Sequence, residues 1–316
     1  MADIAYEKKL RSKLKREKTF TYIWKKRFLY LILLFPLVYI IIFYYLPMWG
    51  AIISFMNYIP GESIFKSEWI GFKNFEMIFQ SKLFLGALRN TLIISSYRLI
   101  FSFPAPIIIA LLLNEVHNRY YKKSIQIIIV FPHFVSWVII GGIILSFLSA
   151  SDGLVNQILV SLGNEKISFL TEPRYFRWIL VFSGIWKEFG MSSVIYLAAI
   201  SSVDISLYEA AIIDGANRWQ QTRYITLPEI QGTILILFIL SLSGILNAGL
   251  DQVLVLLNPM VSDVGETLDT YVYKVGLTTG KFSLSTAMGL FKSAVGFFLI
   301  ITSNAFIKKI NGESIF

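Results

Sequence analysis

The chain has 316 residues, of which 55% are hydrophobic, and its mean hydropathy is +0.64. This apolar share exceeds that of an average soluble domain, so the sequence predicts an integral membrane protein. Cysteine is absent and only two residues, His117 and His133, are histidines. The absence of cysteine excludes a disulfide framework, a thiolate metal site and a cysteine nucleophile. The two histidines are the only candidates for a histidine-based metal site or catalytic triad.

The net charge of +9 is concentrated at the N-terminus, because ten of the 29 Lys and Arg residues lie before position 28. Residues 1–27 are therefore predicted to form a basic cytosolic tail, drawn to anionic lipid at the cytoplasmic face. A nucleic-acid-binding arm is the less favoured alternative, since no pattern of base-stacking aromatic residues accompanies these charges.

Residues 28–46 are uncharged and long enough to cross a hydrocarbon core of about 30 Å. We interpret them as a retained first span rather than a signal peptide, because bulky residues follow them where a cleavage site needs small ones. The mixed stretch 50–87 is expected to be an extracytoplasmic connection with short amphipathic helices. Five further apolar runs lie at about 88–113, 124–149, 178–202, 229–257 and 285–307. The fold class is thus an all-α membrane protein, with a six-span domain over 28–310.

The distribution of positive charge between the loops predicts the orientation. With the tail inside, the segments on that side hold 17 Lys and Arg residues and the opposite face holds 8. Both termini are therefore expected in the cytosol. The bias depends on the tail, because without it the counts are 7 and 8.

A mostly polar segment, 204–228, separates the fourth and fifth apolar runs, and on this orientation it is cytosolic. Gly215 is predicted to lie where a helix stops and the chain turns with positive φ. Pro228 would open the next apolar run, where proline is tolerated. The segment is expected to form a helix, a turn and a second short helix.

This segment resembles the EAA loop of permeases of ATP-binding-cassette (ABC) importers. The resemblance is carried by Glu209-Ala210-Ala211, Gly215 and Ile225-x-Leu227-Pro228. It implies the type I ABC importer permease fold and coupling helices that dock on a separate ATPase subunit, through Tyr208, Glu209, Ala210, Ala211, Asp214 and Gly215. The alternative is an ordinary amphipathic connector whose glycine and proline only cap helices.

The rest of the chain resembles the LplB-type branch of carbohydrate permeases, which import oligosaccharides or polysaccharide fragments. The shared motifs include Asn90-Thr91, Leu111 to Glu115, Phe131 to Trp137, Ile185 to Glu188, Tyr196 to Ala199, Asn258-Pro259 and Leu268 to Tyr271. The resemblance implies a subunit of the bacterial cytoplasmic membrane whose partners are a second homologous permease, two ATPase subunits and an extracellular solute-binding protein. No cofactor is expected in this chain, since ATP and Mg would be bound by the ATPase.

The sequence itself contains no phosphate-binding loop. The nearest match, Gly276 to Phe282, has Val275 where the pattern needs glycine and Phe282 where it needs Ser or Thr. An ion-coupled secondary sugar carrier is the main rival class, but such carriers usually show internal repeats, and none is convincing here. A membrane enzyme acting on polysaccharide is the weakest alternative.

Polar residues inside the spans are candidates for sugar contact, because charged groups there are costly and need a partner or water. By resemblance to the maltose-type permease, Lys187, Glu188, Met191, Gly249 and Gln252 belong to the sugar site. Trp186 could stack on a sugar ring, while Asn247, Asp251 and Gln252 would share one helical face. The alternative is a buried ion-pair network of Lys187, Glu188 and Asp251.

The remaining polar residues of the spans have more structural interpretations. Lys292 could bind a uronate or compensate Asp251. Arg89 and Arg98 are interpreted as structural, with one reaching the interface by snorkelling. His133 is more often a packing residue than a proton relay in such a setting, and Asn304 is expected to hydrogen-bond between helices.

Overall fold

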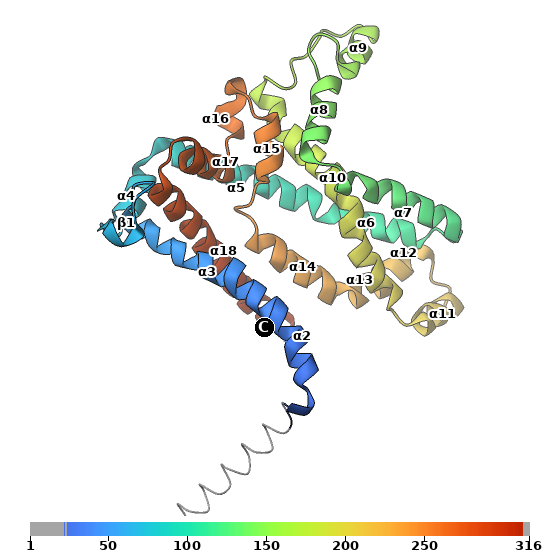
Figure 1. Cartoon of the computed structure of the whole chain (residues 1–316). Helices are drawn as coiled ribbons and strands as arrows, with labels where there is room; N and C mark the ends of the chain where they lie inside the picture. The colour runs from blue at the N-terminus through green and yellow to red at the C-terminus, as the bar shows by residue number, and fades with distance from the viewer. Residues whose placement is uncertain (1–21, 23, 312–316) are drawn as a thin grey trace, which may run out of the picture. The chain divides into compact units, whose positions relative to one another are not determined.

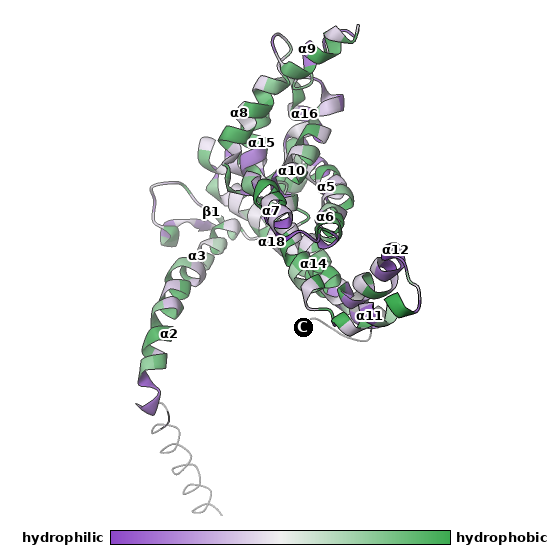
Figure 2. Cartoon of the chain, turned by 90° about the vertical axis from the view of Figure 1, so that its right-hand side faces the viewer, coloured by the Kyte–Doolittle hydropathy of each residue, from purple (hydrophilic) through white to green (hydrophobic). Residues whose placement is uncertain are grey.

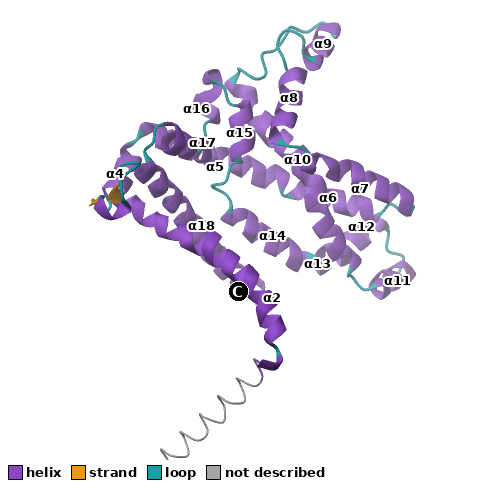
Figure 3. Cartoon of the chain, in the orientation of Figure 1, coloured by secondary structure: helices purple, strands orange, loops and turns teal. Residues whose placement is uncertain are grey.

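The computed structural model describes residue 22 and residues 24–311. The predicted basic tail, 1–27, therefore lies mostly outside the described residues. The chain divides into two compact units, Met1–Ile53 and Ser54–Phe316. The described residues of both units are mostly helical, as the colouring of Figure 3 shows.

The first unit contains one long apolar helix. Helix α2 (Arg27–Ile40) continues through the π-helical turn η1 (Ile41–Tyr45) and α3 (Leu46–Met48) into the 3-10 helix η2 (Trp49–Phe55). Its 29 residues rise about 1.5 Å each, enough to cross a membrane core of about 30 Å. None of the residues of α2 and α3 is buried within the protein, and Figure 2 shows many hydrophobic positions along them. These side chains need lipid or a partner subunit to cover them.

The second unit holds the remaining elements (Figure 1). Its helices are α4 (Lys73–Gln80), α5 (Lys82–Ser102), α6 (Pro104–Asn114), α7 (Arg119–Phe134), α8 (Trp137–Phe147), α9 (Leu154–Ser161), α10 (Pro173–Ser201), α11 (Ile205–Ile213), α12 (Arg218–Gln221), α13 (Leu227–Glu229), α14 (Gln231–Ser243), α15 (Leu250–Leu256), α16 (Ser262–Gly265), α17 (Leu268–Tyr273) and α18 (Phe282–Asn311). Short turns η3 (Ile64–Lys66), η4 (Thr222–Thr226), η5 (Pro259–Val261) and η6 (Lys274–Thr278) join them.

Two strands interrupt the region expected to hold only short helices. Strands β1 (Met56–Asn57) and β2 (Glu68–Trp69) pair antiparallel, with Met56 opposite Trp69. Asn74 at the start of α4 fixes this hairpin, because its side-chain amide donates to the carbonyl oxygens of Ser54 and Met56 at 2.8 and 3.0 Å. The expectation for 50–87 was therefore incomplete, although α4 is one of the helices it included.

Helix α10 is the central element of the second unit and packs against α5, α6 and α7. Helix α14 packs along α18, and α15 packs against α8. One apolar core joins α5, α10 and α15 around Ile94, Phe176 and Val253, and another joins α6 and α10 around Ala110 and Tyr196. Gly190 permits the contact of α10 with α7, since a Cβ there would overlap the carbonyl oxygen of Ile129.

Among the described residues, three continuous helical stretches are long and apolar enough to span a membrane, namely Arg27–Phe55, Lys82–Asn114 and Phe282–Ala305. Three others are bent pairs. Helices α7 and α8 meet at 98°, α10 and α11 at 70°, and the α12–α13 stretch bends by 62° into α14. The run 124–149 is thus a sharply bent pair rather than one straight helix.

The run 229–257 is also not continuous. Helix α14 ends at Ser243 and α15 begins at Leu250, so residues 244–249 form a break. Gly249 has φ +81°, a conformation that residues other than glycine seldom adopt. This break, together with the turn after α11, sets the geometry of the candidate sites.

Candidate functional site

The segment predicted to couple to an ATPase folds as two short helices joined by a tight turn. Asp204 caps α11 by accepting a hydrogen bond from the Ser206 N–H at 2.9 Å, which holds the pKa of its carboxyl below the ordinary value. At the other end, the N–H of Gly215 donates to Ile212 and that of Ala216 donates to Ala211. These two bonds form a Schellman motif, with Gly215 at φ +80°. The predicted helix stop at Gly215 is confirmed.

The second helix is tied back to the first. Asn217 and Gln220 form a capping box at the start of α12. The Gln221 side chain donates to the Ala216 carbonyl at 2.9 Å, and the hydroxyls of Tyr208 and Thr226 lie 2.8 Å apart. The segment is therefore braced mainly by its own residues, and Arg218 also pairs with Glu115 and contacts His117 between α6 and α7.

The outer surface of the segment is accessible and partly apolar. Glu209, Ala210, Asp214 and Gly215 are exposed, and Tyr208 and Ala211 are half-buried. Several large side chains are exposed on this surface, among them Ile213 at 86% and Trp219 at 69%. An apolar surface of this kind, surrounded by polar groups, is typical of a protein-binding site.

A second cluster of predicted residues lies at the bend between α7 and α8. The Lys187 ammonium of α10 donates to the carbonyl oxygens of Pro132, His133 and Val135 at 3.3, 2.6 and 2.7 Å. These carbonyls lie at the C-terminal end of α7 and just beyond it, where helix carbonyls lack their usual donors, and that of Pro132 also accepts from the Val135 N–H. Lys187 is only 7% exposed, so it acts as a cap for the bend.

The alternative of an ion-pair network between Lys187, Glu188 and Asp251 is wrong. Glu188 instead bonds His133, with Oε2 and Nδ1 2.8 Å apart. Asp251 is exposed in the first turn of α15 and pairs with no residue that the structure describes. The three groups point apart because adjacent helix positions differ by about 100° and α15 starts only after the break.

The expected shared helical face of Asn247, Asp251 and Gln252 is also wrong, because Asn247 lies in the break and not in a helix. The break is held from outside, by Asp269 of α17. Its carboxylate accepts from the Ala248 N–H at 3.0 Å and forms an ion pair with Lys292 of α18. Lys292 therefore compensates Asp269 and not Asp251.

Arg98 of α5 reaches the other side of the break. Its Nη2 donates to the side-chain oxygen of Gln252, whose amide nitrogen donates to the Leu180 carbonyl and the Ser183 hydroxyl at 2.8 and 2.7 Å. A Cβ on Gly249 would lie 3.0 Å from Arg98 Nη1, so glycine makes room for the guanidinium. Arg98 thus lies within the protein and does not snorkel.

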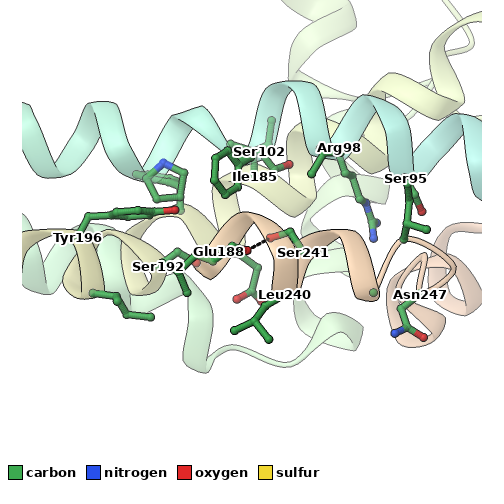
Figure 4. Close-up of a pocket in the computed structure, with 18 residues that line it drawn as sticks. Ser95, Arg98, Ser102, Ile185, Glu188, Ser192, Tyr196, Leu240, Ser241 and Asn247 are labelled. Carbon is green, nitrogen blue, oxygen red and sulfur yellow. Dashed lines mark hydrogen bonds between the residues drawn. The ribbon is translucent and has the colours of Figure 1, made fainter. Parts of the chain in front are cut away.

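A cavity of about 450 Å³ opens between α5, α6, α10, α14 and the break. Its polar lining includes Ser95, Arg98, Glu188, Tyr196, Ser241 and Asn247. Figure 4 shows Ser95, Arg98 and Asn247 toward one end and Tyr196 and Ser192 toward the other. The size and mixed lining are those of a small-molecule site.

Of the predicted sugar-contact residues, Glu188 and Asn247 line this cavity. Trp186 lines a second, mainly apolar cavity of about 430 Å³ between α8 and α10, beside Trp178 and Phe182. The others line neither cavity, namely Lys187, Met191, Gly249, Asp251 and Gln252. The sequence reading missed Ser95 and assigned Arg98 only a structural role. The available signal was Arg98 in the middle of an apolar run, 88–113, that contains no acidic residue.

Comparison with known proteins identifies this architecture. Residues 102–312 match the family described as "Binding-protein-dependent transport system inner membrane component". Protein LplB of Bacillus subtilis (strain 168) is 46% identical over 92% of both chains. The polygalacturonan/rhamnogalacturonan transport system permease protein YteP of the same organism is 43% identical over 96% of this chain and 94% of its own.

The fold is also similar to a solved transporter. A chain in the crystal structure of a bacterial alginate ABC transporter in complex with an alginate pentasaccharide-bound periplasmic protein is 38% identical, with a TM-score of 0.85. The match covers 93% of this chain and 98% of that one. These similarities give no support to an ion-coupled carrier. The chain belongs to the family of binding-protein-dependent transport system inner membrane components, the permease subunits of ABC importers.

Proposed function

We propose that this chain is the transmembrane permease subunit of an ATP-driven importer for oligosaccharides or polysaccharide fragments in the bacterial cytoplasmic membrane. Its partners are a second homologous permease, two ATPase subunits that bind ATP and Mg, and an extracellular binding protein that delivers the sugar. The observation that carries the proposal is the exposed, self-braced segment 204–228 in a chain of this family. A permease subunit whose transport is driven by ATP hydrolysis in another subunit needs an exposed surface of this kind, on which that subunit can dock.

Coupling requires that ATP changes the relative stability of the outward-open and inward-open arrangements. The two helices of the segment are fixed to each other by the Tyr208–Thr226 contact, and α11 follows α10 after a short turn. Docking of an ATPase on α11 therefore moves α10, the helix against which α5, α6 and α7 pack. In this proposal both termini are cytosolic, on the same side as the segment.

Individual residues of the segment have distinct roles in the proposal. Glu209 anchors the segment to a basic group of the ATPase. Ala210, Ala211 and Gly215 let its backbone approach, because their side chains are small, while Tyr208 and Asp214 shape the two ends. Exposure of Glu209, Ala210 and Gly215 supports this assignment.

The oligosaccharide class is supported by the cavity and by relatives named for oligosaccharide or polysaccharide transport. Glu188, Asn247 and the hydroxyls of Ser192, Tyr196 and Ser241 can bind sugar hydroxyls from the cavity wall. Trp186 offers an aromatic face at the second cavity. Lys187, Gly249 and Gln252 would act indirectly by holding the bend and Arg98, and Met191 and Asp251 would contact sugar only in another arrangement of the spans.

The test is sugar-stimulated ATPase activity of the assembly purified with its co-encoded partners. Glu209→Ala should lower the stimulated rate about tenfold or more, equivalent to a loss of ~1.4 kcal/mol in coupling. Glu229→Ala, which removes an exposed glutamate just beyond the segment, is the matched control and should behave like the native chain. Equal activity of all three proteins would contradict the coupling role.

A further inference from the structure

We propose that the end of the cavity formed by Ser95, Arg98 and Asn247, here named the Arg98 subsite, binds the carboxylate of a uronic acid unit. The transported oligosaccharide would then be acidic. This inference rests on the proposed function and adds the charge of the substrate and the residues that recognise it.

The first observation is a half-buried cation that forms no ion pair with a described residue. Arg98 has no carboxylate within 4.0 Å among the described residues, and the neutral amide oxygen of Gln252 is its hydrogen-bond acceptor. Its Nε is buried without any partner. A charged group inside a membrane-spanning helix is costly unless a counter-charge or water reaches it. Arg98 lines the cavity, so a ligand in the cavity can supply that counter-charge.

The second observation is that another unsatisfied group lies beside the first. The Ser95 hydroxyl is also buried without a partner, and it lines the same cavity. Positions 95 and 98 are three apart on α5, so their side chains are neighbours on one face of the helix. Across the described residues only four side-chain atoms are buried and unpaired, and two of them meet here. Both can donate to an anion.

The third observation is that the guanidinium is held in place. Gln252 binds one of its edges and is itself fixed by Leu180 and Ser183. A Cβ added to Gly184 would lie 3.8 Å from both Nε and Nη2, and Gly249 leaves room for Nη1. A planar fork with a fixed orientation suits the two oxygens of a carboxylate, which arginine binds in bidentate geometry.

The nearby charges favour an anion at this end of the cavity. Asp269 pairs with Lys292, accepts from the Ala248 N–H and also attracts Arg98, so Arg98, Lys292 and Asp269 together carry one net positive charge. Glu188 also lines the cavity, but it is engaged by His133. In Figure 4 Glu188 lies away from the Arg98 end, between that end and Ser192. A uronate carboxylate can therefore approach Arg98 while the sugar hydroxyls reach Glu188.

The experiment compares acidic oligosaccharides with neutral counterparts that differ only at the carboxyl group. The probes are oligogalacturonates and oligomannuronates, each with its carboxyl-reduced form, and neutral arabino-oligosaccharides. The readout is the maximal sugar-stimulated ATPase rate of the complete assembly with its binding protein. We expect the acidic probes of one series to stimulate the native complex at least several-fold more than their reduced forms.

Ser95→Asp places a carboxylate beside Arg98 and should occupy the subsite from within the protein. We expect it to lower stimulation by the acidic probe about tenfold, while the yield of the assembled complex stays at the native value. Arg98→Lys keeps the charge but removes the fork, and should give an intermediate loss. Arg89→Met, on the same helix but exposed and outside the cavity, is the control and should match the native complex.

Each remaining outcome contradicts the subsite. Stimulation by neutral probes alone, or equal stimulation by acidic and reduced forms, shows that no carboxylate is recognised while leaving the sugar importer standing. If the acidic probe still stimulates the Ser95→Asp and Arg98→Lys variants as strongly as the native complex, the carboxylate is recognised elsewhere and water solvates Arg98. If no sugar stimulates the complex at all, the importer proposal fails and the subsite fails with it.

Discussion

The coupling segment 204–228 and the break 244–249 both interrupt the helices, but they are built in opposite ways. The hydrogen bonds within the segment join residues at most 18 positions apart, as in the Tyr208–Thr226 pair, and its exposed Arg218 also pairs with Glu115 and contacts His117, 101 positions earlier. The break is held by Asp269 and Lys292 from later helices, and Gln252 beside it binds Arg98, 154 positions earlier. The first is a local structure placed at the surface, whereas the second exists only when distant helices have assembled.

This difference matters for transport. A segment whose shape is set mainly by its own hydrogen bonds can transmit force from another subunit without refolding. The break is held by residues of α5, α17 and α18, so its geometry changes when those helices move. It also forms part of the cavity wall. The predictions below separate these two kinds of construction.

Removal of Asp269 should have the largest effect. Asp269→Ala leaves the Lys292 ammonium, 21% exposed, without its partner and should cost about 3–5 kcal/mol of unfolding free energy. Thermal unfolding of the purified assembly in detergent measures this loss. Asp263→Ala, at an exposed carboxylate of α16, is the control and should change little. A stability of Asp269→Ala close to that of the control would show that the break stands without its ion pair.

Removal of the Lys187 cap should be the next largest effect. Lys187→Met removes the donor to the carbonyls of His133 and Val135, while that of Pro132 keeps its bond from the Val135 N–H, and should cost about 2–3 kcal/mol. The same thermal unfolding assay applies, with Lys123→Met on the exposed side of α7 as its control. If both variants unfold together with the native chain, the bend has another source.

A change at Gly215 should have a smaller, local effect. Gly215→Ala forces a Cβ into the left-handed region at φ +80° and should destabilise the turn by about 1 kcal/mol. Gly232→Ala, in α14 with open space around it, should be neutral or slightly stabilising. Hydrogen exchange of residues 210–220 measures the local change. Faster exchange throughout the chain, rather than in this turn, would contradict the local construction.

The smallest effect is expected at the contact between the two helices of the segment. Tyr208→Phe removes the hydrogen bond with Thr226 and should cost about 0.5 kcal/mol. Its control is Tyr120→Phe, at a side chain that is 73% exposed. Because the bond braces the coupling segment, sugar-stimulated ATPase activity should fall more than thermal stability does. An equal fall in both would indicate only a general loss of structure.

The structural features that could be predicted from the sequence are those set by residues close together in the chain. The turn at Gly215 follows from a glycine after a helical run, and the six apolar stretches follow from composition. The bend at Val135 and Ser136 has no glycine, and its stabilising group, Lys187, comes from another helix. It could therefore not be read from the run 124–149.

The cavity shows the same limit. Gly244 and Gly249 on either side of Asn247 were a signal for a break, but the apolar residues around them favoured one continuous span. Which arginine would reach the break depends on how α5 packs against α10 and α15. That packing is a property of the assembled helices and not of any one stretch.

The central claim, that segment 204–228 docks on an ATPase, can be tested most directly by cysteine labelling, since the native chain has no cysteine. Ile213→Cys and Glu165→Cys place single thiols at exposed positions in the segment and in the loop between α9 and α10. We predict that co-assembly with the ATPase subunits slows labelling at position 213 at least tenfold and leaves position 165 unchanged. Equal labelling at position 213 with and without the ATPase subunits would contradict the account.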